Sequence, residues 1–552
     1  MNNALSLLLS LLCLILSSPI VFAGKGAAVT KGSALTAAER RAASQLRVTT
    51  IREVTAHLVA KDMQGRGAAQ PGADRAAQYI ADRFASIGLT PGGDSSTYLQ
   101  SIKFKIENML PESSLKVGET VFQYKNDFAF YPPFPAEPKD VSGGLVFAGY
   151  GVVSDELKRD DLAGIDVKGK IVLLLSGKPK NVDAGVWAKA SDDEAVYGRL
   201  ILKGAVGFLV NQQEEDGETL PFKVYPASHR LVSLAEAPPL PYKVPPIVVI
   251  SDPAGEKIFA AQGKTLARVK RQAEAGEFVS RDLSVQAVIS PRTKREEGTS
   301  SNVIGWIEGS DANLKREALI YTAHYDAFGV DYEGRVYAGA ADNALGVGKL
   351  IAMAEVLAGM TTKPRRSIIF MATTAEEYSM IGAEYWLKHP TWPLDRVVAD
   401  INYDGIGTEV WGNFGFIVDL GFDHSDLGKV IKEVAASRRI KIIPDQWPEV
   451  GIFYQADHYP FVKKGIPALY LIGGPVGDLK AIVKRAETWL QADYHQPGDS
   501  VRPSWKWNGA RGLAVLGLIA GMRIANQEAM PAWRADSPYN RPRGTNLPPP
   551  EQ

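Results

Sequence analysis

The chain has 552 residues, and its 62 Lys and Arg residues balance 62 Asp and Glu residues, so the formal net charge is zero. This balance gives no support to nucleic acid or an anionic membrane surface as a partner. A hydrophobic content of 45% is sufficient for ordinary cores, and the length indicates more than one domain.

The first 23 residues have the pattern of a signal peptide. Leu7 to Leu16 is almost wholly apolar, and Val21-Phe22-Ala23 resembles a small-residue cleavage site, although no Lys or Arg precedes the apolar run. A membrane anchor is the alternative, but the run is short for a span. Leu11-Leu12 before Cys13 disfavours a lipoprotein. We therefore predict export to the periplasm or the exterior after cleavage, without a stable membrane anchor.

Cys13 is the only cysteine of the chain. It lies inside the predicted signal peptide, so the mature protein is expected to contain none. Disulfides, cysteine nucleophiles and thiolate metal sites are then excluded.

Residues 36 to 135 form the expected N-terminal segment of the main domain. Helices are predicted at 37–46, 51–60 and 72–88, and strands at 100–104 and 121–130. In the third helix the apolar spacing indicates one buried face, formed by Ala76, Ile80, Phe84 and Ile87.

Residues 136 to 280 have a different texture and are expected to form a compact β-rich insert. Strands are predicted at 145–153, 168–177, 206–211 and 244–251, with helices at 199–205 and from about 253.

From 285 to 530, predicted strands alternate with predicted helices. The strands are 318–324, 366–377, 397–405 and 467–473, and the longest helices are 344–357 and 509–526. This alternation predicts an α/β fold, with a mainly parallel or mixed sheet flanked by helices. The tail 531–552, rich in proline and polar residues, is predicted to be disordered.

Candidate metal ligands lie at the ends of the predicted strands. His324, Asp404 and the pair Glu376-Glu377 each follow an apolar run. Open α/β sheets assemble their ligand crevice at the carboxyl ends of strands. Mixed nitrogen and oxygen ligands suit zinc, and an excess of carboxylates suits two metal ions that share one ligand. A metal-dependent hydrolase is therefore the leading hypothesis.

Several of these residues also have a purely structural explanation. Asp342 precedes a helix and is equally well explained as an N-cap, and Asp404 is compatible with an ordinary turn. His324 and Asp326 share a strand face, so the carboxylate is placed to hold the far nitrogen of a metal-binding imidazole. Taken alone, this pair is more often a strand end without metal.

The pair Glu376-Glu377 carries the strongest chemical signal. Two adjacent acids at the end of an apolar strand would repel each other, and a metal that binds one relieves the conflict. The other is then placed to act as a general base beside a metal-bound water. His495 lies in a predicted loop, where histidines are usually only exposed, and His458 is the other histidine of interest.

Taken in order, these stretches resemble the co-catalytic zinc aminopeptidases, a family that includes glutamate carboxypeptidase and the non-catalytic transferrin receptor. The resemblance covers most of the chain and rests on five motifs: His324 and Asp326; Asp342-Asn343; Glu376, Glu377 and Gly382; Asn402, Asp404 and Gly407; and Tyr494-His495. Ala341 and Leu345 depart from the usual Asp and Ser, but neither is a ligand position.

The resemblance implies two zinc ions held by five residues: Asp342 between them, His324 and Asp404 at one ion, Glu377 and His495 at the other. It also implies that Glu376 is the general base, that Asp326 supports His324 and that Tyr494 stabilises the oxyanion. A cis peptide bond is expected between Asp342 and Asn343.

The insert resembles the protease-associated domain through the stretches at 143–177 and 204–210. In the family this domain is taken to shape or cover the substrate cleft, and it catalyses nothing itself.

The resulting hypothesis is an exported di-zinc aminopeptidase that acts on peptides with a free N-terminus. A carboxypeptidase or dipeptidase is the alternative, but Arg335 alone does not make a carboxylate site. Glutaminyl cyclase relatives use one metal, which the five ligands disfavour. A non-catalytic binding protein would be expected to lack ligands, and none is missing. Trp447, Phe453 and Tyr454 are candidates for a side-chain pocket.

Overall fold

A computed structural model describes residues 34–131, 139–179, 182–192, 194–211, 230–237, 244–275, 280–331 and 333–546. The predicted signal peptide, residues 1–23, lies outside this part of the chain. Within the described ranges, every helix is too short or too polar to span a bilayer.

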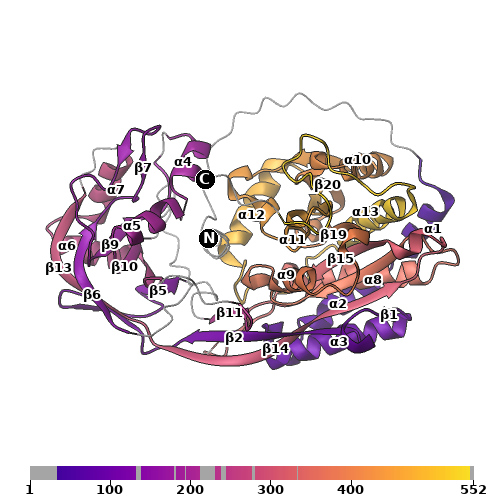
Figure 1. Ribbon diagram of the computed structural model, residues 1–552, viewed down its shortest axis with the longest axis horizontal. Helices are drawn as coiled ribbons and strands as arrows, with labels where there is room; N and C mark the ends of the chain where they lie inside the picture. Colours follow the sequence, from indigo (N-terminus) through magenta and orange to yellow (C-terminus); the bar gives the residue numbers. More distant parts are fainter. Residues whose placement is uncertain are drawn as a thin grey trace. The chain divides into compact units, whose positions relative to one another are not determined.

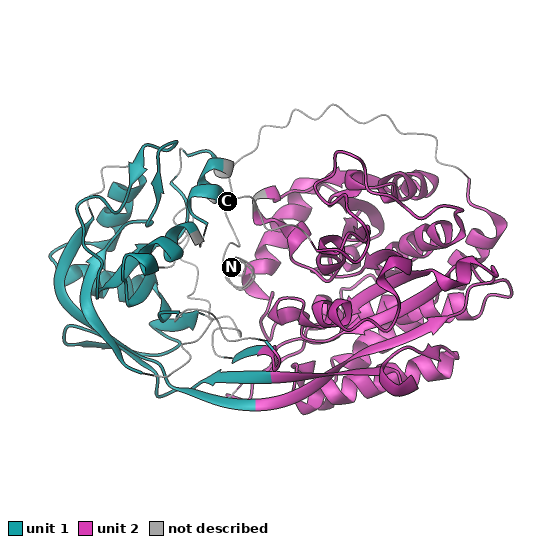
Figure 2. Ribbon diagram, in the orientation of Figure 1, with its two compact units in different colours: residues 1–22, 105–232, 237–296 teal, residues 23–104, 233–236, 297–552 magenta. Residues whose placement is uncertain are grey.

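The chain divides into two compact units (Figure 2). Among the described residues, the insert unit lies within 105–232 and 237–296, and the main unit within 34–104, 233–236 and 297–546.

The main unit is built on a sheet of eight strands. Its central strands β15 (Ala318–His324), β18 (Ser367–Thr373), β19 (Val397–Asn402) and β22 (Ala468–Tyr470) are parallel. The remaining strands are β14 (Thr293–Ile307), antiparallel to β18, with β2 (Leu99–Met109), β11 (Arg230–Leu234) and β1 (Thr90–Pro91). Every residue of β15 and β18 is buried, as is typical of strands covered on both faces. The predicted α/β fold is confirmed.

Alternate residues of β15 enter two different cores. Leu319, Tyr321 and Ala323 pack into the larger core, and Ala318 and Ile320 into the smaller one, since successive side chains of a strand point to opposite faces. Helices on the larger core are α1 (Ala37–Gln45), α2 (Val48–Leu58), α3 (Pro71–Ile87), α8 (Leu345–Ala358), α10 (Leu427–Ser437) and α13 (Trp507–Asn526), and those on the smaller core are α9 (Ile381–Lys388) and α11 (His458–Lys463) (Figure 1).

Two glycines allow α13 to lie directly on the sheet. A Cβ atom on Gly517 would lie 1.7 Å from the Tyr403 hydroxyl, and one on Gly521 would lie 1.8 Å from the Tyr321 hydroxyl. The Tyr321 hydroxyl instead donates a hydrogen bond of 3.1 Å to the Gly517 carbonyl. The ends of β15 and β19 are thereby fixed against a rigid helix.

A smaller sheet in the main unit has the order β21 (Lys441–Pro444), β20 (Phe414–Asp419), β23 (Gly473–Pro475). The two-stranded β16 (Gly329–Val330) and β17 (Val336–Tyr337) precede α8, and α12 (Leu479–Ala492) precedes α13.

The insert unit is built on its own sheet of eight strands, in the order β4, β3, β13, β6, β9, β10, β12, β5. Their bounds are β3 (Ser114–Val117), β4 (Thr120–Phe122), β5 (Phe128–Tyr131), β6 (Val141–Phe147), β9 (Ile171–Leu175), β10 (Gly207–Asn211), β12 (Ile247–Ile250) and β13 (Arg281–Ser290). Strands β6, β9, β10 and β12 are parallel. The helices are α4 (Ala184–Ala190), α5 (Arg199–Leu202), α6 (Asp252–Ala260) and α7 (Leu266–Glu274), and β7 (Val153–Ser154) pairs with β8 (Arg159–Asp160).

The insert unit is larger than the predicted range of 136–280. It begins at Lys105 and ends at Glu296, because β3, β4 and β5 on one side and β13 on the other pair into the same sheet. The single strand predicted at 121–130 is in fact two strands, β4 and β5, with Lys125 at a positive φ of 69° between them.

The prediction of a disordered tail is wrong for residues 531–546. The Trp533 indole donates to the Gly465 carbonyl at 2.8 Å, Tyr539 is buried, and Arg543 Nε donates to the Val397 carbonyl at 3.0 Å. Two aromatic rings and an arginine thus anchor a segment whose average composition is that of a disordered chain. Residues 547–552 lie outside the described part.

Candidate metal centre

The carboxyl ends of β15, β18 and β19 bring the predicted site residues together. His324 ends β15, Glu376 and Glu377 follow β18, and Asp404 follows β19. Asp342 arrives from the segment before α8, and His495 from the loop after α12. All six side chains are buried.

Two groups of potential ligand atoms form around Asp342. In the first, His324 Nε2 lies 3.1 Å from Asp342 Oδ1 and 3.2 Å from Asp404 Oδ1. In the second, His495 Nε2 lies 2.9 Å from Glu377 Oε2 and 3.4 Å from Asp342 Oδ2. Within each group the ligand atoms lie within 4.8 Å of one another, and Asp342 contributes one oxygen to each.

Asp342 does not cap the helix that follows it. The N-cap position is Ala344, and the side chain that bonds the first turn is that of Asn343, whose Oδ1 accepts a hydrogen bond of 3.0 Å from Gly346 N while its Nδ2 donates to the Tyr403 carbonyl at 2.7 Å. The peptide bond between Asp342 and Asn343 is cis, as the resemblance implied. The carboxylate of Asp342 is therefore left to face the two imidazoles.

Asp326 offers two acceptors to the far nitrogen of His324. The acceptor nearest to His324 Nδ1 is the backbone carbonyl of Asp326, at 3.2 Å, while its carboxylate Oδ1 is 3.6 Å away. That same Oδ1 accepts a hydrogen bond of 3.2 Å from Glu376 N. Asp326 therefore links the end of β15 to the segment that follows β18.

Aromatic rings hold the second imidazole in place. Tyr494 stacks on His495 with ring centroids 3.7 Å apart and planes at 25°, and Phe328 contacts the ring edge-on at 4.7 Å. Burial, followed by the nearby carboxylates, raises the pKa of Tyr494 well above its usual range. Tyr494 therefore keeps its hydroxyl proton at neutral pH.

The carboxylates and imidazoles shift each other's pKa values. Burial raises the pKa of Glu376 well above its usual range and that of Glu377 to about 7. Burial opposes charge on the histidines, but the carboxylates outweigh it, so the pKa of His324 lies well above normal and that of His495 at about 9. Burial would likewise raise the pKa of Asp342, but the imidazoles outweigh it and lower that pKa.

The donor set fits zinc. Five carboxyl groups share this space with only two imidazoles, so the carboxylates would be in excess once ionised; they belong to Asp326, Asp342, Glu376, Glu377 and Asp404. A divalent cation offsets such an excess. Imidazole nitrogens and carboxylate oxygens are ligands that zinc accepts, with the imidazoles neutral when they coordinate.

Arg66 lies directly behind the site and was not predicted from the sequence. Its fully buried guanidinium donates to the carbonyls of Tyr325, Ala338 and Gly339, the last two at 2.7 and 2.8 Å. Burial lowers its pKa to about 10, against the opposing influence of Asp326 and other carboxylates. Arg66 thus fastens the loop after β15 to the loop before Asp342.

Asp499 and Asp457 are two further acids that the sequence did not single out for the site. Asp499 accepts hydrogen bonds from Ala341 N and Asp342 N, at 2.9 and 3.0 Å, and burial raises its pKa to about 7. Asp457 accepts from the Thr373 hydroxyl. Asp499 lies only four residues after His495, so that motif was the one available signal.

His458 is not part of either ligand group. It stacks on Tyr470 with centroids 4.6 Å apart, and burial lowers its pKa to about 3, so the ring is neutral. Phe453 contacts it edge-on at 5.1 Å. His458 therefore packs inside an aromatic cluster.

Comparison with known proteins finds a family model that matches the segment carrying this site. Residues 302–519, which contain all the candidate ligands, match the model of "Peptidase family M28". A probable leucine aminopeptidase 2 of Aspergillus oryzae is 24% identical over 355 residues, which are 61% of this chain and 59% of that protein. A vacuolar membrane protease of Clavispora lusitaniae is 32% identical over 108 residues, so the match spans only 20% of this chain and 10% of that protein.

Solved structures share the fold over most of the chain. An aminopeptidase from Aneurinibacillus sp. strain AM-1 superposes with a TM-score of 0.56 at 19% identity and covers 89% of this chain and 97% of its own. A zinc aminopeptidase from Bacillus subtilis gives 0.55 at 19% identity, over 88% of this chain and 97% of its own. The chain thus has the fold of these aminopeptidases, and its segment 302–519 matches the model of peptidase family M28.

Proposed function

We propose that this protein is an exported di-zinc aminopeptidase that releases N-terminal amino acids from peptides. The observation that carries the proposal is the pair of ligand groups that share Asp342. The family match supports a peptidase, and the similar aminopeptidases of Aspergillus oryzae and Bacillus subtilis favour an aminopeptidase over a carboxypeptidase or dipeptidase. Export rests on the signal-peptide pattern of residues 1–23.

In this proposal one zinc ion is held by His324, Asp342 and Asp404, and the other by Asp342, Glu377 and His495. When bound, two such ions acidify a shared water and polarise the peptide carbonyl. The protein contributes the fixed positions of the ligands, which Asp499 and Arg66 hold through the backbone around Asp342.

Glu376 is the proposed general base. Its Oε2 lies 3.7 Å from His324 Nε2, beside both ligand groups but a member of neither. Burial first, then the carboxylates of Asp404 and Asp457, raises the pKa of Glu376, which makes its ionised carboxylate a stronger base than an ordinary one. Such a carboxylate accepts a proton from the attacking water and returns it to the leaving amine.

Tyr494 and Asp326 have supporting roles in the proposal. The Tyr494 hydroxyl, protonated at neutral pH, is the proposed donor to the oxyanion of the tetrahedral intermediate. Asp326 positions His324 and Glu376 through the bonds described above. The insert unit is proposed to be a protease-associated domain.

The test is the hydrolysis of a panel of aminoacyl-anilides by the mature protein, beside N-acetylated versions of the same compounds. We expect release from the free-amine compounds only, and loss of release with a chelator. Cleavage of peptides from the C-terminus, with no release from any anilide, would replace this proposal by a carboxypeptidase. Release that persists after metal removal would refute the metal-dependent mechanism.

A further inference from the structure

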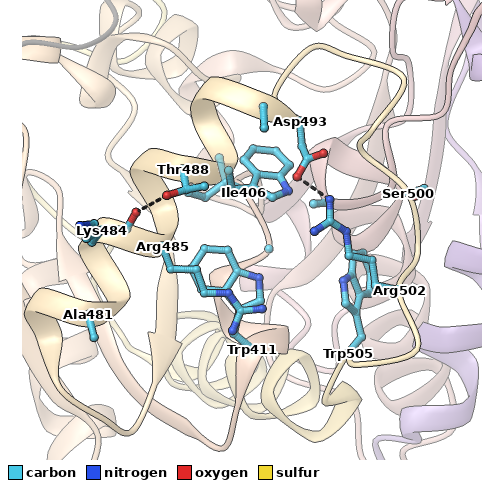
Figure 3. Close-up of a pocket in the computed structure, with 14 residues that line it drawn as sticks. Ile406, Trp411, Ala481, Lys484, Arg485, Thr488, Asp493, Ser500, Arg502 and Trp505 are labelled. Atoms are coloured by element: carbon cyan, nitrogen blue, oxygen red, sulfur yellow. Dashed lines mark hydrogen bonds and ion pairs between the residues drawn. The ribbon is translucent and has the colours of Figure 1, made fainter. Parts of the chain in front are cut away.

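A pocket in the main unit is lined by none of the candidate metal ligands (Figure 3). Its volume is about 730 Å³. One wall is a face of α12, on which Lys484, Arg485, Thr488 and Trp489 follow each other at helical spacing. The other walls come from the turn after Asp404, which supplies Trp411, and from the loop before α13.

Three tryptophans give the pocket planar, apolar surfaces. They are Trp411, Trp489 and Trp505. Trp489 and Trp505 are only 8% and 9% exposed, so their rings are held by the core. Trp505 also contacts Trp507 at 5.2 Å between ring centroids. The aromatic surfaces are therefore preformed, and a ligand would not have to order them.

The charge of the pocket is positive. Lys484, Arg485 and Arg502 line it, against the single acid Asp493, which already pairs with Arg502. In the described part of the chain, the side chains of Lys484 and Arg485 make no ion pair. Burial and the charge of Arg502 both lower the pKa of Arg485, so the two guanidinium groups repel each other electrostatically.

Arg485 joins the two features of the pocket. Its guanidinium carbon lies 4.3 Å from the centroid of the Trp411 ring, within the range of a cation–π contact. A guanidinium over an aromatic ring still has N–H groups that can bind a carboxylate. A ligand with both an aromatic ring and an anionic group can pack its ring against the tryptophans and pair its charge with the cations.

We propose that this pocket is a binding site for small aromatic carboxylates, with Arg485 and Lys484 at the anion and the tryptophans at the ring. A simple inorganic anion would leave the apolar surfaces unused, and a neutral aromatic would leave both cations unpaired. None of the candidate metal ligands lines the pocket, although Ala341, the neighbour of Asp342, does.

The experiment is calorimetric titration of the intact, zinc-loaded protein with 1-naphthoate, which has the ring and the charge. Acetate has the charge alone and 1-naphthalenemethanol the ring alone. We expect naphthoate to bind about tenfold or more tightly than either compound, since each group contributes about 1 to 2 kcal/mol.

Substitutions then locate the binding site. We expect Arg485→Gln to weaken naphthoate binding about tenfold and Lys484→Gln about threefold, since the two cations contact the anion. The matched control is Lys480→Gln, an exposed cation of the same helix that does not line the pocket, and it should leave affinity unchanged. Arg485 is exposed, so its substitution should not affect folding.

Three outcomes would overturn the proposal. The first is no detectable naphthoate binding at millimolar concentration. The second is equal affinity for naphthoate and either partial compound. The third is unchanged affinity in Arg485→Gln, which would place the carboxylate elsewhere, for instance at the candidate metal centre.

Discussion

The two large sheets of this protein both have buried parallel strands, but different kinds of residues follow those strands. Ionisable side chains gather at the strand ends of one sheet, and neutral polar side chains at those of the other. In the main unit, β15, β18 and β19 end in a buried collection of imidazoles and carboxylates. In the insert unit, β9, β10 and β12 are equally buried, but their carboxyl ends carry Asn211 and Ser251. Parallel strands alone therefore do not make a site; the residues at their ends do.

At the carboxyl ends of the insert strands, Asn211, Asp252 and Lys270 interact with one another. Asn211 Nδ2 donates to Asp252 Oδ1 at 3.0 Å, and Lys270 pairs with Asp252 at 2.7 Å. At the candidate metal centre of the main unit, the buried carboxylates outnumber the imidazoles, so this cluster would be completed by a bound cation. This contrast predicts that equivalent substitutions at the two sheets will have very different consequences.

The largest effect is expected for Glu376→Gln. We expect kcat to fall about 10³-fold, within the range for loss of a general base, while zinc content stays unchanged. Steady-state kinetics and metal analysis of the same preparation check both parts. Peptidase activity that survives the substitution would remove Glu376 from the mechanism.

Arg66→Met should cost about 3 kcal/mol of unfolding free energy, because three or more buried carbonyls lose their donor. Urea unfolding measures this cost. Arg66→Lys should recover only a part of it, since an ammonium cannot reach all of these carbonyls at once. Equal stability of the wild type and Arg66→Met would show that the loops after β15 and before Asp342 keep their conformation without Arg66.

Asp499→Asn should weaken zinc affinity about tenfold or more, the usual effect of losing a residue that positions a ligand. The substitution removes the charge that accepts the Ala341 and Asp342 N–H groups. Competition with a chelator of known affinity gives the value. An unchanged zinc affinity, together with an unchanged KM, would mean that the Asp499 carboxylate does not position Asp342.

The smallest effect is expected at the matched position of the insert unit. Asp252→Asn removes one partly exposed ion pair, which is worth about 0.5 kcal/mol, and should leave zinc binding and kcat unchanged. Differential scanning calorimetry and the same peptidase assay provide the comparison. A large loss of activity here would give the insert sheet a functional role.

The sequence was sufficient for the parts of the fold and site that depend on local pattern. The apolar runs predicted β15 and β18, and the short motifs that follow them named His324 and Glu377, which the structure places in two ligand groups. Arg66 was missed because its role depends on a positive φ of 51° and on carbonyls from distant segments. No local pattern encodes those contacts.

The predicted boundaries failed for the same physical reason. Strand β3 pairs with β13, about 170 residues later in the chain, so composition near residue 136 gave no signal of the true edge at Lys105. The prediction for the tail failed because Trp533 and Arg543 bind it to distant segments, and its proline-rich composition gives no sign of these contacts.

The central claim is that two zinc ions share Asp342. A calorimetric titration of the metal-free protein with zinc tests this claim most directly. We predict two equivalents per chain in the wild type, one in His495→Ala, and loss of both high-affinity sites in Asp342→Ala. A single equivalent in the wild type, or two equivalents retained in Asp342→Ala, would contradict the account.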